Sequence, residues 1–204
     1  MMIDGFRYLP GYLSIQTQLE LIQSINDVIL QAPLYRPTMP RSGKPFSVKM
    51  TNCGPLGWVS SKDEGYRYQS LHPELNLPWP AFPPQLLKIW HSVAHYAADP
   101  EACLINWYDA KSKLGLHVDA DEKETAAPVV SISLGDNAWF RIGGLKRGDP
   151  TQRLLVKSGD VIVLGGPARL AHHGIDRILP NTSKLFDIAG RYNLTMRRIN
   201  MASE

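Results

Sequence analysis

Residues 128–164 read PVVSISLGDNAWFRIGGLKRGDPTQRLLVKSGDVIVL. Short runs of β-branched and aromatic residues alternate here with glycine-containing turns, a spacing typical of antiparallel strands. Similar runs lie at 102–108 (ACLINWY) and 191–197 (RYNLTMR). The predicted strands are 102–108, 128–134, 138–142, 153–157, 160–164 and 191–197. Many short strands without helices between them predict an antiparallel sandwich or barrel of the jelly-roll kind.

The first third of the chain predicts helices and irregular segments, so the fold class is mostly β with N-terminal helices (α+β). Ser14 is suited to cap a helix that ends before Pro33, and Pro84 is suited to the first turn of a second helix. The buried stripe of that second helix is expected at Leu86, Ile89, Trp90, Val93 and Ala97. Between the two helices, Pro, Gly and Ser predict extended loops or a hairpin. The helices are expected to cover one face of the sandwich.

Composition excludes several classes of protein. The chain has 204 residues, of which 44% are apolar and 20% charged, as expected for one ordinary globular domain rather than a disordered chain. No apolar run approaches the roughly 20 residues of a membrane helix, and the N-terminus lacks the layout of a secretory signal. Two cysteines cannot form a disulfide framework, so a cytoplasmic location is expected. We also expect a monomer.

The formal charge of +3 hides an uneven distribution. Residues 1–100 hold 8 basic and 7 acidic side chains, residues 101–140 hold 3 and 7, and residues 141–204 hold 11 and 5. Charged loops alone explain such counts. Alternatively, the basic C-terminal third contacts phosphates or carboxylates, and the acidic middle contacts a metal or a cationic ligand.

The sharpest local signal is His117-Val118-Asp119. In a strand, positions i and i+2 project from the same face, so an imidazole and a carboxylate can meet one ion. A second imidazole from a distant strand would complete two His and one carboxylate, the ligand set of non-haem Fe(II) oxygenases. His172 and His173 follow a glycine-rich turn. Neighbouring strand residues point to opposite faces, so only one is expected to serve, and His173 is favoured.

The last predicted strand carries Arg191, Asn193 and Arg197, which share one face by strand parity. A guanidinium group forms two parallel hydrogen bonds with a carboxylate, so this face is suited to a dicarboxylate. The alternative is a solvated edge strand.

Several motifs follow one another in a fixed order. They are Leu104-Ile-Asn-Trp-Tyr108, His117-x-Asp119-x-Asp121, Pro128-Val-Val-Ser-Ile-Ser-Leu-Gly135, Gly143-Gly-Leu-Lys-Arg147, Ser158-Gly-Asp160, His173-Gly-Ile175 and Arg191-Tyr-Asn-Leu-Thr-Met-Arg197. This order closely resembles the bacterial AlkB family of iron(II)- and 2-oxoglutarate-dependent dioxygenases, from about Ser47 to Arg198.

The resemblance implies a double-stranded β-helix (a jelly roll) with a nucleotide-recognition lid. It implies one domain over 1–204, with the helices and lid in 1–100 and the catalytic core in 101–198. His117, Asp119 and His173 would be the iron ligands and thus the catalytic centre. Arg191 would pair with the distal carboxylate of 2-oxoglutarate, and O2 would be the other co-substrate. The remaining implied 2-oxoglutarate contacts are Asn106, Tyr108, Asn193 and Arg197.

For the substrate, the resemblance implies a lid in which Trp58 and Tyr66 stack on a flipped, positively charged base. Asp121 would favour that cationic base over a neutral one, or is only a surface charge. Tyr68 and Arg147 resemble contacts to phosphate or to a base edge. The other tryptophans considered are predicted to be core residues: Trp79, Trp90 and Trp139.

The family removes alkyl groups from nucleobase nitrogens, chiefly in 1-methyladenine and 3-methylcytosine. The resemblance therefore implies oxidative demethylation of single- or double-stranded DNA, with release of formaldehyde and conversion of 2-oxoglutarate to succinate and CO2. This is direct-reversal DNA repair. One alternative is the same mechanism acting on RNA or tRNA, as demethylase or hydroxylase. The other is a jelly-roll module that binds nucleic acid without turnover.

Overall fold

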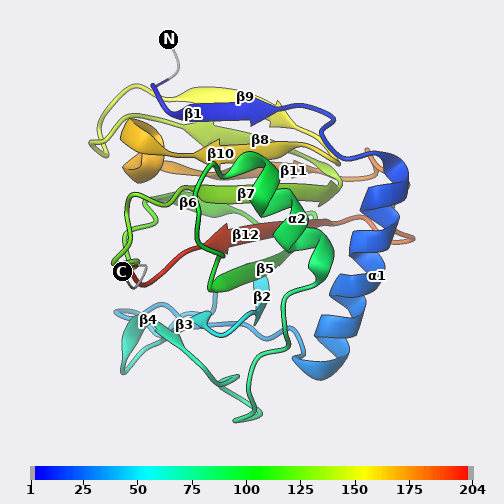
Figure 1. Ribbon diagram of the computed structural model, residues 1–204, viewed down its shortest axis with the longest axis vertical. Coiled ribbons are helices and arrows are strands. Elements are labelled where there is room, and N and C mark those ends of the chain that lie inside the picture. The colour runs from blue at the N-terminus through cyan, green and yellow to red at the C-terminus, as the bar shows by residue number, and fades with distance from the viewer. Residues whose placement is uncertain (1–2, 202–204) are drawn as a thin grey trace.

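The structure, a computed structural model, describes residues 3–201 and consists mainly of two facing sheets. The larger sheet has the order β1 (Phe6–Leu9), β10 (Val161–Leu164), β7 (Val129–Gly135), β12 (Arg191–Arg197), β5 (Ala102–Tyr108) and β2 (Lys49–Cys53). The smaller has the order β6 (Leu114–His117), β11 (His173–Leu179), β8 (Asn137–Ile142) and β9 (Gln152–Val156). All these strand pairs are antiparallel. The predicted jelly roll is confirmed (Figure 1).

Strand parity divides the larger sheet into two faces. On β12, Leu194 and Met196 belong to a core shared with the helices, whereas Arg191, Asn193 and Arg197 line a pocket between the sheets. Because β12 lies between β7 and β5, the alternative of a solvated edge strand is wrong. The pocket residues are therefore held by hydrogen-bonded neighbours on both sides.

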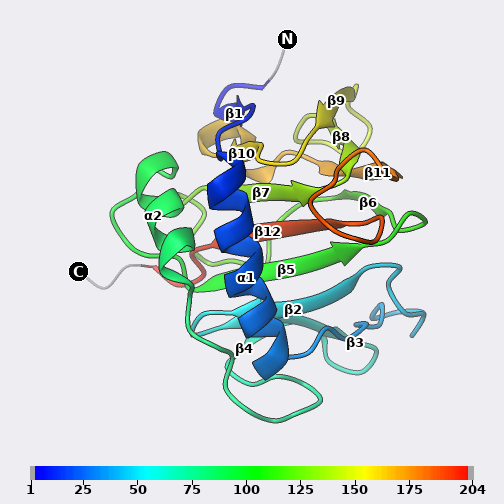
Figure 2. The ribbon, with the colours of Figure 1, turned by 90° about the vertical axis from the view of Figure 1, so that its right-hand side faces the viewer.

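Two helices cover the outer face of the larger sheet. Helix α1 (Ile15–Gln31) begins where the Ser14 side chain accepts a hydrogen bond from the Thr17 backbone N–H (3.1 Å), as predicted. Helix α2 (Pro84–Val93) begins with its proline. Figure 2 shows α2 on one side of the larger sheet and the smaller sheet on the other. In the described part of the chain, no helix is long and apolar enough to cross a membrane.

Two local predictions need correction, and two strands of the larger sheet were missed. Ala97 is exposed, because α2 already ends at Val93 and His95 adopts a left-handed φ of 52°. Trp139 is only half-buried on the outer face of β8, since its neighbours Ala138 and Phe140 point inward. Two strands of the larger sheet, β1 and β2, were not predicted, although β2 falls in the segment expected to hold loops or a hairpin.

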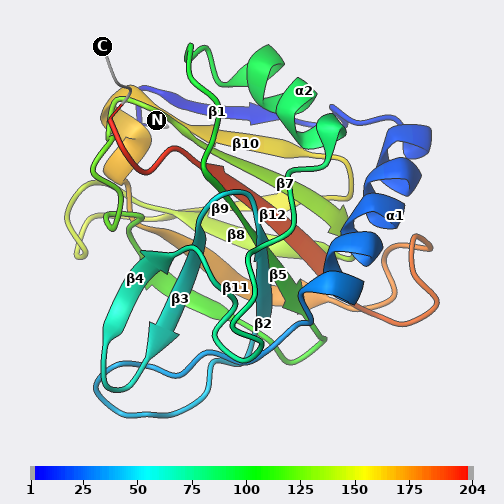
Figure 3. The same ribbon diagram turned by 60° about the horizontal axis from the view of Figure 1, so that its bottom comes forward.

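A separate hairpin projects beside the pocket. It pairs β3 (Gly57–Ser61) with β4 (Gly65–Gln69) in the segment where a hairpin was predicted. Figure 3 shows this hairpin at the open end of the sandwich, with the loop that connects α1 to β2 running along it. A short 3-10 helix, Gly166–Leu170, leads into β11.

Candidate metal centre and substrate pocket

Two histidines meet because their strands are paired. His117 ends β6 and His173 begins β11, and the two residues are direct partners in the antiparallel register. The strands come close at Gly174, where an added Cβ would lie 2.6 Å from the Leu114 carbonyl oxygen. Asp119 follows two residues after His117, so the local chain path brings its carboxylate to the same point. Strand β6 ends at His117, so Asp119 lies just beyond the strand that the i, i+2 prediction assumed, yet its carboxylate belongs to the same cluster.

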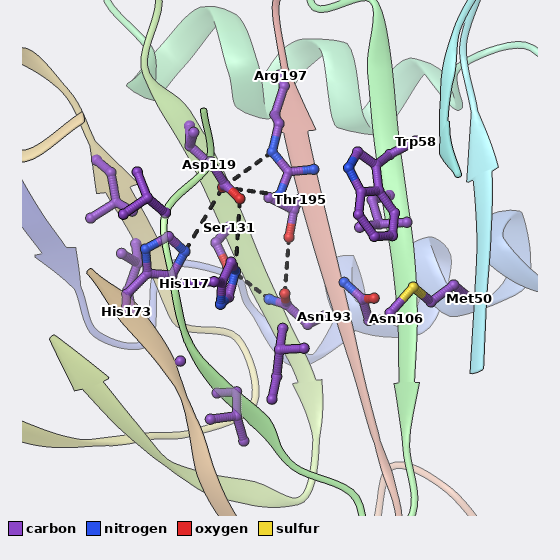
Figure 4. A pocket seen from close by; sticks show the side chains of 18 of the residues that line it. Met50, Trp58, Asn106, His117, Asp119, Ser131, His173, Asn193, Thr195 and Arg197 are labelled. Carbon is purple, nitrogen blue, oxygen red and sulfur yellow. Dashed lines mark hydrogen bonds and ion pairs between the residues drawn. The ribbon is translucent and has the colours of Figure 1, made fainter. Parts of the chain in front are cut away.

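The three side chains form a group of metal-ligand type. One ligand atom from each of His117, Asp119 and His173 lies within 4.8 Å of the others. Each imidazole Nδ1 lies 2.9 Å from a backbone carbonyl, that of Gly115 or Ala171. A carbonyl can only accept, so Nδ1 carries the proton and Nε2 keeps its lone pair. Both Nε2 atoms face Asp119, at 3.7 and 3.8 Å from its carboxylate oxygens (Figure 4).

The electrostatics favour the ligand forms of these groups. Burial, together with the nearby His117, lowers the pKa of His173 to about 4, which keeps its imidazole neutral. Burial alone would raise the pKa of Asp119, but the Arg197 guanidinium and the two imidazoles hold it well below its usual range. A neutral imidazole and an ionised carboxylate are the forms that bind a divalent metal.

His172 does not join this group. Its Nδ1 lies 3.4 Å from the Gly144 carbonyl oxygen, and the metal-type cluster contains His173 alone of the adjacent pair. The cluster therefore supports His173, the residue that the sequence favoured.

The pocket beside the triad contains buried donors without partners. Arg191 is 2% exposed; its Nη2 donates to Ser133 Oγ (2.8 Å), but Nε and Nη1 have no partner among the described residues. Burial lowers its pKa to about 10, so it stays a cation at neutral pH. Its guanidinium lies 5.5 Å from the centre of the Tyr108 ring. An unpaired buried cation is costly, so this end of the pocket is suited to an anionic ligand.

Two more side chains from the same face extend this polar surface. Asn106 and Asn193 are direct partners across β5 and β12, and Asn106 Oδ1 is buried without a hydrogen bond from any described residue. Asn193 donates to Ser131 Oγ at 2.7 Å. The arrangement fits a ligand with two carboxylates, because Arg191 begins β12 and Arg197, which donates to Asp119 of the triad, ends it.

Arg197 lies at the triad end. It donates through Nη2 and Nε to one oxygen of Asp119 (2.9 and 3.1 Å), and its Nε is 3.4 Å from Glu122. Its Nη1 is buried without a partner in the described structure. Arg197 therefore orients a carboxylate of the triad and still has a donor left for a ligand.

Glu122 is a structural residue of the site that the sequence did not reveal. It is 6% exposed and pairs with Arg169 at 3.0 Å as well as approaching Arg197. It also accepts a hydrogen bond from the Tyr68 hydroxyl at 2.5 Å. Glu122 therefore ties the loop after Asp119 to the hairpin.

The hairpin places aromatic side chains over the pocket. Trp58 and Tyr66 both line it and stack with their centroids 5.4 Å apart. The Trp58 indole N–H donates to Asp121 at 2.8 Å, which brings a carboxylate beside the aromatic pair. Tyr68 is turned toward Glu122 and does not line the pocket. Arg147 is exposed in the loop after β8, outside the pocket lining.

The fold and this constellation define the class of Fe(II)- and 2-oxoglutarate-dependent oxygenases. The family model of the 2OG-Fe(II) oxygenase superfamily matches residues 5–197. The chain is 48% identical over 202 residues to an "Alpha-ketoglutarate-dependent dioxygenase AlkB homolog" of Caulobacter vibrioides, covering 98% of this chain and 90% of that protein. It is 46% identical over 183 residues to "Alpha-ketoglutarate-dependent dioxygenase AlkB" of Escherichia coli, covering 88% and 83%.

A solved structure described as "The structure of OsALKBH1" superposes with a TM-score of 0.81 at 30% identity, covering 97% of this chain and 98% of that one. The chain therefore belongs to the bacterial AlkB family of dioxygenases, as its motifs predicted. As members of this family do, it uses Fe(II), 2-oxoglutarate and O2.

Proposed function

We propose that this dioxygenase removes alkyl groups from nitrogen atoms of nucleobases in DNA, such as 1-methyladenine and 3-methylcytosine. Formaldehyde is released and 2-oxoglutarate becomes succinate and CO2, which makes the reaction a direct-reversal repair of DNA. The observation that carries the proposal is a single pocket lined by three kinds of group. These are the metal-type triad, the arginine donors without partners among the described residues, and a stacked aromatic pair.

In this proposal His117, Asp119 and His173 hold Fe(II). The bound metal, with 2-oxoglutarate and O2, supplies the oxidising power for attack on the N-methyl carbon. The protein fixes the geometry: backbone carbonyls orient both imidazoles, and Arg197 orients Asp119. The same hydrogen bonds fix the tautomer of each neutral imidazole, so that its Nε2 lone pair is the one turned toward Asp119.

Arg191 binds the distal carboxylate of 2-oxoglutarate through its unpartnered Nε and Nη1. Tyr108 packs against that guanidinium and Asn193 lies beside it on β12. At the other end, Arg197 Nη1 and Asn106 face the part of the co-substrate nearest the triad. The buried donors of Arg191 and Arg197 that have no partner among the described residues are thereby satisfied when 2-oxoglutarate enters.

Trp58 and Tyr66 bind the damaged base. N-methylation at these positions makes adenine or cytosine cationic, and a cation over an aromatic face gains electrostatic energy in addition to stacking. Asp121, held at the edge of the pair by the Trp58 indole, favours the cationic base further. Two other residues contribute to substrate binding less directly. Tyr68 holds the hairpin in place through Glu122, and Arg147 contacts a phosphate of the nucleic acid.

The test uses oligonucleotides that carry one 3-methylcytosine, as DNA and as RNA, with Fe(II), 2-oxoglutarate and O2. Loss of the methyl mass is expected with the wild-type enzyme and with His172→Ala, but not with His173→Ala. The adjacent histidine is a matched control, because it lies outside the triad. An enzyme that consumes 2-oxoglutarate but demethylates neither strand type would contradict the proposal.

The same assay decides between the alternatives. Demethylation of RNA in preference to DNA would make the enzyme an RNA or tRNA demethylase with the same mechanism. The alternative of a module that binds without turnover does not fit a chain that belongs to the AlkB dioxygenases. Three predictions remain: a single domain with helices and lid in 1–100 and the catalytic core in 101–198, a monomeric state, and a cytoplasmic location. Light scattering tests the oligomeric state.

A further inference from the structure

Basic side chains are concentrated in one stretch that the regional charge sums conceal. From Val28 to Lys62 the sequence contains five basic residues and no acidic one. Four of these basic residues and two from a neighbouring turn lie on three segments that contact one another, and we call this group the basic rim. Its members are Arg36, Arg41, Lys44, Lys62, Lys111 and Lys113.

Three segments are tied together to form the rim. The loop between α1 and β2 binds the turn after β5, since Ser47 Oγ donates to the Lys113 carbonyl oxygen (2.8 Å) and accepts from the Lys113 N–H (3.2 Å). The same loop docks on the hairpin, where Ser60 Oγ donates to the Thr38 carbonyl oxygen at 2.6 Å. At the hairpin tip, the Lys62 side chain packs over Gly43: a Cβ built on Gly43 would lie 3.1 Å from Lys62 Cδ.

The rim borders the pocket directly. Arg36 donates to the backbone carbonyls of Phe46 (3.1 Å) and Ser47 (3.0 Å), and Phe46 both lines the pocket and contacts Trp58 edge to face, with centroids 6.2 Å apart. On the adjacent segment, Lys113 precedes Leu114, another lining residue. A nucleotide whose base stacks on Trp58 therefore has its sugar and phosphate within reach of this side.

The charges of the rim are largely uncompensated. All six basic side chains are exposed, and only Arg36 has an ion pair among the described residues, a 4.0 Å contact with Asp109. At the hairpin tip, Glu64 is already paired with Arg67 at 2.6 Å, which leaves Asp63 and Asp109 as the local acids. Of the acidic residues that line the pocket, Asp121 is exposed, whereas Asp119 and Glu122 are buried and paired with Arg197 and Arg169. The rim therefore keeps a net positive charge.

We propose that the basic rim binds the phosphate backbone of the nucleic-acid strand whose damaged base occupies the pocket, which rests on the proposed function. An extrahelical base enters between the hairpin and β6, and its own and adjacent phosphates stay outside. The net positive charge of the rim attracts these phosphates, so the strand runs over the loop of Arg41 and Lys44. Such contacts give affinity without sequence preference.

The test compares Arg41→Ser/Lys44→Ser with Lys88→Ser/Lys157→Ser, a control that removes two exposed charges outside the rim. The probe is a short single-stranded DNA with one 3-methylcytosine. Binding is measured by fluorescence anisotropy against salt, and turnover on this DNA is compared with turnover on free 3-methylcytidine, which has no phosphate. Since roughly 0.7 counterions are released per phosphate contact to a single strand, losing two contacts lowers the salt slope by about 1.4.

At about 0.1 M salt, that change in slope weakens DNA binding by about 25-fold relative to wild type. We expect this loss for the rim variant, with kcat and nucleoside turnover unchanged, and no loss for the control. Equal affinity and slope for the wild type and the rim variant would overturn the rim proposal, as would an equal loss in the control. Failure of the proposed function looks different: the wild type itself then demethylates neither the DNA nor the nucleoside.

Discussion

Arg191→Lys is the substitution that most directly probes the co-substrate end of the pocket. The wild-type guanidinium is buried, gives one hydrogen bond to Ser133 and presents two further donors without partners. Lysine keeps the positive charge but replaces the planar fork with a single ammonium. It can therefore satisfy Ser133 or reach the carboxylate at one point, but it cannot hold both carboxylate oxygens in parallel.

The expected magnitude follows from the lost contact. A hydrogen bond between charged groups contributes about 1.5–3 kcal/mol, so losing one of the two bonds to the carboxylate weakens 2-oxoglutarate binding roughly 10- to 150-fold at about 1.4 kcal/mol per tenfold. The free energy of unfolding without co-substrate should change far less, because the partnerless donors stabilise nothing in the ligand-free protein.

The assay is succinate formation against 2-oxoglutarate concentration, with the midpoint of thermal unfolding measured in parallel. Arg141→Lys is the matched control, since Arg141 pairs with Asp176 at 2.7 Å on the outer face of the smaller sheet. The control should keep the wild-type KM for 2-oxoglutarate. The reasoning is refuted if Arg191→Lys also keeps it, or if both variants raise it equally.

Three further predictions concern the metal, the base and the acid stability of the fold. His173→Ala should abolish Fe(II)-dependent turnover and weaken metal binding measured by titration calorimetry; retained affinity would remove it from the ligand set. Trp58→Ala should raise the KM for methylated DNA about 10- to 100-fold, since stacking contributes roughly 1–3 kcal/mol per base, while the KM for 2-oxoglutarate stays constant; the opposite pattern would assign Trp58 to the co-substrate. Burial alone would raise the pKa of Glu101, but hydrogen bonds from Asn200 and Ile199 lower it. Its stabilisation is therefore complete above the pKa of the unfolded state and is lost as the pH falls through the lower pKa of the folded state. In urea titrations, the free energy of unfolding of the wild type should exceed that of Glu101→Gln at neutral pH, and this difference should shrink in acid. A difference that stays constant with pH would contradict the prediction.

Short-range periodicity was enough to predict the arrangement of the catalytic face. Alternation along 191–197 placed Arg191, Asn193 and Arg197 on one side, and the structure has them there. The same alternation places Trp139 on the outer face, between the inward-facing Ala138 and Phe140, so its aromatic character alone does not make it a core residue.

Contacts between distant segments could not be predicted in this way. Glu122 looks like any acidic loop residue in the sequence, because its burial depends on Arg169, Arg197 and Tyr68, which come from other parts of the chain. The basic rim could not be predicted for a related reason. Its residues belong to two regions, 1–100 and 101–140, whose charge totals also include acidic residues. The tertiary fold alone brings Lys113 next to Ser47.

The central claim is that oxidation of 2-oxoglutarate in this pocket is coupled to removal of an N-methyl group from a nucleobase. The most direct measurement is the ratio of formaldehyde to succinate formed on DNA that carries 3-methylcytosine, corrected for turnover on the same DNA without the lesion. We predict equal amounts of the two products with the wild-type enzyme and neither product with Asp119→Ala. Succinate formed at the same rate with and without the lesion, and no formaldehyde, would contradict the account.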